Sequence, residues 1–84
     1  MQNLKAYVES RNAWAKIFNG AQLNLKSAAD RQKIADMIDA DLSPENLSCD
    51  GELPASQVRA RFNSLMKVAN ELKAFDPAVK MYEV

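Results

Sequence analysis

Apolar residues recur at alternating steps of four and three along residues 55–75, and this spacing constrains the fold more than any other feature. The series is Val58, Phe62, Leu65, Ala69 and Leu72. Residues at these intervals lie on one side of an α-helix, so the segment predicts a long amphipathic helix. Asp76-Pro77 follows. Because the residue before a proline disfavours helical geometry, we expect the helix to end near residue 75.

Two shorter apolar patterns precede this segment. The first predicts a helix over residues 4–19, with one side formed by Leu4, Tyr7, Val8, Trp14, Ala15 and Phe18. The second predicts a helix over residues 28–41, with a narrow apolar face formed by Ile34, Met37, Ile38 and Leu42. Asn3 and Ser27 have the side chains of N-caps, and Asn19-Gly20 is typical of a helix end. Residues 21–27 are expected to form the connecting loop.

Arg11 interrupts the apolar side of the first helix, seven residues from both Leu4 and Phe18. We expect its methylene groups to cover the edge of the core while its guanidinium reaches water or a carboxylate. Asp30 and Asp41 lie at the edge or centre of the apolar face of the second helix, so either one is a possible partner for Arg11.

The stretch between the second and third helices predicts a structured corner. Ser43-Pro44 is typical of a helix start, so a short turn of helix is expected at 44–48, with Leu42 and Leu47 paired as a hydrophobic staple. Asp50-Gly51 predicts a chain reversal. Together the patterns predict one all-α domain over residues 1–84, a three-helix up-down-up bundle with an acidic corner between its second and third helices. In the tail, residues 76–84, we expect Val79 or Tyr82 to dock on the bundle or the chain to pair as a short strand.

Charge is polarised along the chain although the formal net charge is zero. Residues 36–53 contain six carboxylates and no basic residue. Such a cluster can steer encounters with a basic protein partner, and the alternative is a solvated face that maintains solubility. The predicted protein-binding residues are Asp36, Asp39, Asp41, Glu45, Asp50 and Glu52.

The long helix offers a different binding class. Opposite its apolar side it carries basic and amide side chains that can contact phosphates and base edges, namely Arg59, Asn63, Lys67 and Asn70. The neutral net charge and the long connection between the second and third helices argue against a nucleic-acid-binding protein. We therefore keep nucleic acid as the alternative partner.

Residue types argue against catalysis. The chain has no histidine, one cysteine and no glycine-rich phosphate loop. Aligning Gly51 with the glycine of an EF-hand loop puts Gln57 where a bidentate glutamate is required, so no metal is expected. No cofactor is expected either. Apolar runs are too short to span a membrane, which makes the cytoplasm the expected location, and the chain is expected to be a monomer or a homodimer.

Residues 41–75 resemble the small uncharacterised helical proteins that bacteriophages and prophages encode. The resemblance rests on the run D-L-S-P-E-N-L-S-C-D-G-E-L-P and on V-R-A-R-F-N-S-L-M-K-V-A-N-E-L after it. It implies a bacterial cytoplasm and a non-enzymatic accessory role that modulates a host protein. It assigns no binding residue to this chain.

Overall fold

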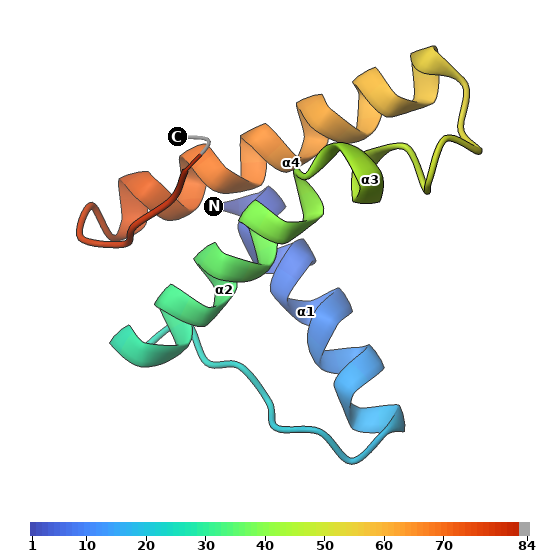
Figure 1. Cartoon of the computed structure of the whole chain (residues 1–84). Helices are drawn as coiled ribbons and strands as arrows, with labels where there is room; N and C mark the ends of the chain where they lie inside the picture. The colour runs from blue at the N-terminus through green and yellow to red at the C-terminus, as the bar shows by residue number, and fades with distance from the viewer. Residues whose placement is uncertain (83–84) are drawn as a thin grey trace.

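The computed structural model describes residues 1–82, and its regular structure in that range consists of four α-helices (Figure 1). They are α1 (Gln2–Ile17), α2 (Ala28–Asp41), α3 (Pro44–Leu47) and α4 (Ala55–Phe75). No strand occurs among residues 1–82, and the predicted all-α class is confirmed.

The helix bounds follow local signals in the sequence. α2 and α4 occupy the predicted ranges, and α3 lies within the predicted turn at 44–48. The Ser27 hydroxyl accepts the backbone N–H of Asp30 at 3.3 Å, as expected of an N-cap. α1 begins and ends two residues earlier than predicted, so Asn3 lies inside the first turn and its prediction as the N-cap is wrong. The physical reason is that a carboxylate from α4 supplies the acceptor at this helix end.

α1 ends with a left-handed residue at the predicted position. Asn19 has φ of 55°. The N–H of Gly20 donates to the carbonyl of Ala15 at 2.6 Å, and the N–H of Asn19 donates to the carbonyl of Lys16 at 3.3 Å. This pair of hydrogen bonds is the Schellman motif, which satisfies two of the carbonyls that a helix end leaves free.

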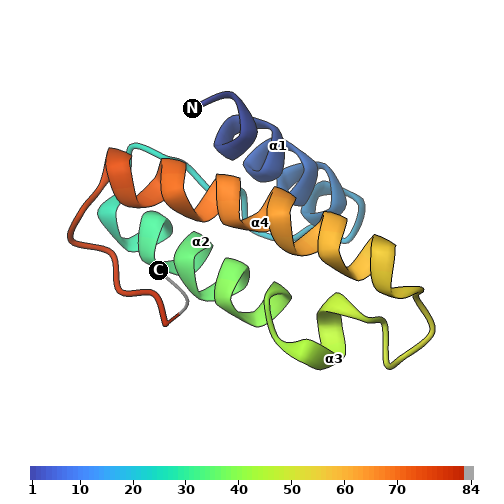
Figure 2. The same ribbon diagram turned by 90° about the horizontal axis from the view of Figure 1, so that it is seen from above.

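α4 is the element on which the other helices are placed. α1 and α2 both pack against it, and α3 contacts both α2 and α4. Seen from above, α4 runs between α1 and α2 (Figure 2). Away from α4 the two helices spread apart, and the loop after α1 crosses the open end between them (Figure 1). As a result, α1 is covered along only part of its length.

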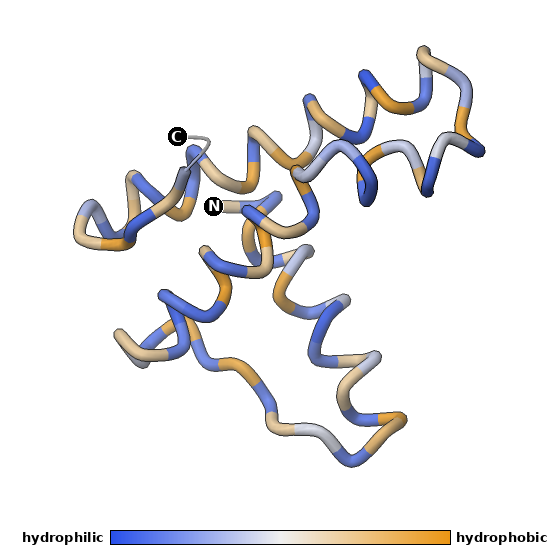
Figure 3. Tube along the Cα trace, in the orientation of Figure 1, coloured by the Kyte–Doolittle hydropathy of each residue, from blue (hydrophilic) through white to orange (hydrophobic). Residues whose placement is uncertain are grey.

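The hydrophobic core lies where the first half of α1 and the second half of α2 meet the second half of α4. Its fully buried large side chains are Leu4, Ile34, Ile38 and Leu72. The other buried apolar residues are Val8, Ala35, Leu42, Leu47, Val68, Ala69 and Val79. Apolar residues nevertheless continue to the C-terminal end of α1, beyond the core (Figure 3).

The corner between α2 and α4 is held by apolar contacts and by an unusual backbone. Leu42 and Leu47 are both buried, as expected of the staple. Pro44 occupies the first position of α3, whereas the Ser43 side chain makes no capping hydrogen bond. Residues 49–51 all have positive φ, with values of 50°, 58° and 86°. The chain reverses at this point, as Asp50-Gly51 predicted.

The segment after α4 folds back onto α2. Val79 is buried in the core, whereas Tyr82 is 97% exposed. The side-chain amide of Gln32 accepts the backbone N–H of Lys80 and donates to the backbone carbonyl of Lys80, both at 3.0 Å. Of the expected docking residues, Val79 is therefore the one that docks. The remaining residues of the predicted tail, 83–84, lie outside the described part of the chain.

Candidate functional site

Three large apolar side chains lie exposed on the second half of α1. Trp14, Ile17 and Phe18 are 62%, 69% and 74% exposed. The rings of Trp14 and Phe18 are stacked one helical turn apart, with centroids 6.4 Å apart and planes 9° from parallel. Single exposed apolar residues are common on protein surfaces, whereas grouped apolar side chains such as these are often functional. We call these three residues the aromatic patch.

A groove of about 350 Å³ lies beside this patch, between α1, the loop that follows it and α2. Its apolar lining consists of Trp14, Ala15, Phe18, Ala21, Leu23 and Met37, and we call it the aromatic groove. Arg11 and Asn12 supply the polar part of the lining. An apolar pocket with a small number of fixed polar groups is the usual form of a binding site.

Asn12 fixes the loop that forms one side of the groove. Its side chain accepts the backbone N–H of Leu23 at 2.8 Å and donates to the carbonyl of Leu23 at 2.9 Å. The carbonyl of Asn12 also accepts a hydrogen bond from the Gln22 side chain at 3.1 Å. These contacts hold Leu23 against α1, so the groove is formed before any partner binds.

The guanidinium of Arg11 pairs with the carboxylate of Asp41. The sequence left Asp30 and Asp41 as possible partners, and the structure selects Asp41; Asp30 instead accepts the N–H of Asn24. The Tyr7 hydroxyl donates to the same Asp41 oxygen at 2.6 Å, and the Arg11 guanidinium lies 5.4 Å from the centre of the Tyr7 ring. Burial and the hydrogen bond to Asp41 raise the pKa of Tyr7. The same carboxylate raises the pKa of Arg11, so this cation stays charged at the groove.

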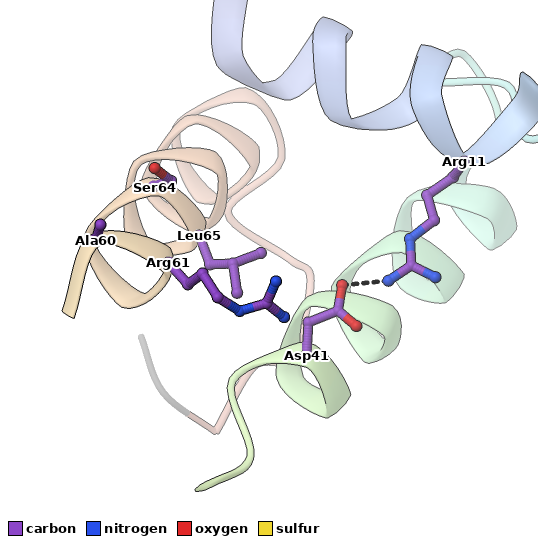
Figure 4. A pocket seen from close by; sticks show the side chains of 6 residues that line it. All are labelled: Arg11, Asp41, Ala60, Arg61, Ser64 and Leu65. Carbon is purple, nitrogen blue, oxygen red and sulfur yellow. Dashed lines mark hydrogen bonds and ion pairs between the residues drawn. The ribbon is translucent and has the colours of Figure 1, made fainter. Parts of the chain in front are cut away.

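A second pocket of about 440 Å³ opens between this ion pair and α4. In Figure 4 the side chains of Arg11 and Arg61 lie on opposite sides of Asp41. Arg61 donates to the backbone carbonyls of Leu47 and Asn46, each at 3.1 Å. Both guanidinium groups therefore already have acceptors within the protein. The contacts of Arg11 join α1 to α2, and those of Arg61 join α4 to α3.

The six predicted protein-binding carboxylates do not share one environment. Asp36, Glu45, Asp50 and Glu52 are exposed. Asp39 and Asp41 are half-buried: Asp41 pairs with Arg11, and Asp39 accepts the backbone N–H of Tyr82 at 3.1 Å. The first four are thus exposed, with Asp36 also accepting the Gln32 side-chain amide at 3.0 Å, and the other two hold the fold. Their role in protein binding stays a prediction.

The residues predicted as an alternative nucleic-acid-binding set lie close together on α4. They are Arg59, Asn63, Lys67 and Asn70, and all four side chains are exposed. They follow one another at steps of four, four and three along α4, so they form a row on its solvent face.

The aromatic groove includes residues that the sequence did not mark as functional. Trp14 and Phe18 were expected on the apolar side of α1. Periodicity does not reveal that this part of the apolar side is left uncovered. Met37 was expected on the apolar face of α2, and Leu23 was expected only to anchor a loop. Their convergence depends on how far α1 and α2 spread apart, which no local pattern encodes.

Two further findings bear on the kind of site. Among residues 1–82, no three histidine, cysteine, aspartate or glutamate side chains gather closely enough to hold a metal ion. In the same range, no helix is both long and apolar enough to cross a membrane. Comparison with protein-family models, with curated proteins and with solved structures finds no match to this chain.

Proposed function

We propose that this protein is a non-enzymatic protein-binding module that docks an amphipathic helix in its aromatic groove. The observation that carries the proposal is the exposure of the stacked Trp14 and Phe18 rings beside a preformed apolar groove. Exposing two aromatic rings to water is unfavourable, and covering them with a partner removes that cost.

The chemistry of the groove matches helix-in-groove recognition. In that mode, apolar side chains one turn apart on the partner helix enter an apolar groove. Tryptophan and arginine are the residue types most enriched among the side chains that dominate binding energy, and Trp14 and Arg11 both line the groove. Because Asp41 neutralises Arg11, a partner meets an apolar surface with a hydrogen-bonded ion pair at one part of it.

Several expectations from the sequence stay predictions, and the docking proposal depends on none of them. They are the bacteriophage or prophage origin, the bacterial cytoplasm as location, a host protein as the modulated target, the up-down-up order of a three-helix bundle, and the acidic corner as a surface for a basic partner.

Selection from a displayed library of amphipathic helical peptides tests the proposal. We expect the wild-type protein to enrich peptides with aromatic or leucine side chains one turn apart. A bait with Trp14→Ser and Phe18→Ser should enrich none of them, because both substitutions remove apolar surface from the groove. Tyr82→Ser is the matched control, since Tyr82 is an exposed aromatic residue that does not line the groove. Equal enrichment by all three baits would contradict the proposal.

Nucleic-acid binding is a second candidate because four residues suited to phosphate and base contacts share one exposed row on α4. Fluorescence anisotropy with labelled DNA and RNA at two salt concentrations tests it. Binding that weakens with salt, and weakens further in Arg59→Ala and Lys67→Ala, is the expected result. If neither labelled nucleic acid binds at low salt, the candidate is removed.

A further inference from the structure

We infer that the helix docked in the aromatic groove is α1 of a second copy of this chain, so that the protein forms a symmetric homodimer. This inference rests on the proposed function and names its partner. It follows from three properties of the groove: self-complementary shape, apolar area and charge.

The aromatic patch and the aromatic groove are adjacent parts of one face. Trp14 and Phe18 contribute to both, since they line the groove and still expose more than half of their surface. A two-fold axis beside these rings places the patch of each copy against the groove of the other. Such an isologous contact requires a surface that can pair with itself, and an exposed aromatic patch next to an apolar groove meets this requirement.

The area fits a weak dimer. Trp and Phe side chains have about 150 to 250 Å² each, so the exposed fractions of Trp14 and Phe18 leave about 200 to 350 Å² of apolar surface per chain, to which the exposed part of Ile17 adds. With the half-buried lining of the groove, two copies together remove about 1,000 Å² from water, the lower limit for a specific interface. An interface at this lower limit is typical of weak association, so we expect the dimer to form only at micromolar or higher concentrations.

Charge does not oppose association of two copies. The formal net charge of the chain is zero, so two copies do not repel each other at long range. None of the three patch side chains is ionisable, and Arg11, the charged residue that lines the groove, is paired with Asp41 within its own chain. Arginine is also well suited to a partly buried position beside stacked aromatic rings.

Trp14 is the only tryptophan in the chain, so its fluorescence reports directly on this contact. We would measure molar mass by light scattering and tryptophan emission on the same samples of the full chain, from about 1 to about 500 µM, a range that covers the concentrations at which the dimer is expected to form. The mass should rise from the 9.4 kDa of one chain toward twice that value. The emission maximum should shift to shorter wavelength over the same concentration range.

Variants tie the dimer to the groove. Phe18→Ser and Ile17→Ser keep Trp14 as the reporter, and we expect each to weaken dimerisation by more than about tenfold. Both residues are exposed in the single chain, so helical circular dichroism and the melting temperature of dilute samples should match the wild type. Tyr82→Ser should dimerise as the wild type does.

The outcomes separate this inference from the proposed function. A wild-type mass of one chain at every concentration overturns the dimer, and peptide enrichment in the selection described above would then still support the docking groove. A dimer that persists in Phe18→Ser and Ile17→Ser, without a shift in Trp14 emission, also overturns the inference because it uses another face. Loss of the dimer in Tyr82→Ser as well would also overturn the inference, because Tyr82 does not line the aromatic groove.

Discussion

The carboxylate of Glu71 in α4 accepts the backbone N–H of Leu4 in α1 at 3.0 Å, so one helix supplies the N-terminal cap of another. The second Glu71 oxygen accepts the side-chain amide of Asn3 at 2.7 Å. The first turn of a helix has free N–H groups and the positive end of the helix dipole, and a carboxylate satisfies both. These contacts, first among them the Leu4 hydrogen bond, lower the pKa of Glu71 from 4.5 to about 2.

Stability should therefore fall in acid. A carboxyl group whose pKa is lower in the folded state stabilises the fold above its unfolded value of 4.5, and this contribution is lost as the pH falls toward 2. Glu71→Gln should lower the melting temperature at neutral pH and reduce its fall below pH 4.5. Asp76 leaves a residual fall, since its hydrogen bond with Arg31 lowers its pKa as well. Glu9→Gln, at an exposed position, is the control, and a Glu71→Gln profile parallel to that of the wild type would contradict this role.

The Asp41 carboxylate should stabilise the fold more than an ordinary surface charge does, because it accepts hydrogen bonds from both Arg11 and Tyr7. We expect Asp41→Ala to lower the free energy of unfolding by about 1 to 2 kcal/mol, and Tyr7→Phe by about 1 kcal/mol. Since Arg11 is partly exposed, a double-mutant cycle of Asp41→Ala with Arg11→Met should give a coupling of about 0.5 to 1 kcal/mol. Urea unfolding measures all of these values. Additive effects of the two substitutions would show that the pair contributes nothing.

Cys49→Gly should stabilise the protein. Cys49 has φ of 50°, a left-handed conformation that costs a side-chain-bearing residue about 1 to 2 kcal/mol and glycine nothing. The greater chain entropy of glycine in the unfolded state offsets part of this gain. We therefore expect the free energy of unfolding, measured in urea, to rise by about 0.5 to 1 kcal/mol. Ser48→Gly is the matched control, since Ser48 has φ of −91° and its hydroxyl donates to the Pro44 carbonyl, so the same change should destabilise. A loss of stability in Cys49→Gly would contradict this account.

The acidic corner can be tested apart from the ion pairs that hold the fold. We would reverse charge at Glu45, Asp50 and Glu52, which are exposed, and leave Asp39 and Asp41 intact. The triple lysine variant should keep its helicity and its melting temperature. If the corner docks a basic partner, association with basic proteins from a bacterial lysate should fall and should depend on salt. Association that is unchanged by the triple variant would remove the acidic corner as a docking surface.

Local sequence signals were sufficient to predict α2 and α4. Ser27 caps the start of α2, and Pro77 prevents α4 from continuing. Positive φ at Asn19 and Gly51 likewise lies where Asn-Gly and Asp-Gly predicted it. Each of these features depends on contacts within about five residues, which is the range over which side-chain and backbone preferences act.

The start of α1 and the exposed aromatic rings needed long-range information. Glu71 is 67 residues from Leu4, so nothing near the start of α1 indicates where its cap comes from. The helical period places Trp14 on the same side of α1 as Leu4, but Trp14 is exposed and Leu4 is fully buried. Periodicity identifies the side of a helix that is apolar. Whether another element covers that side depends on how the helices pack, and this also decided between Asp30 and Asp41 as the partner of Arg11.

The hydrogen bonds between Gln32 and Lys80 involve only the main chain of residue 80. Every amino acid except proline offers that same N–H and C=O, so the identity of this side chain is free to change without releasing the segment. Position 80 is therefore a convenient attachment point for a spectroscopic label, because a dye carried there would report on the segment without disturbing what holds it.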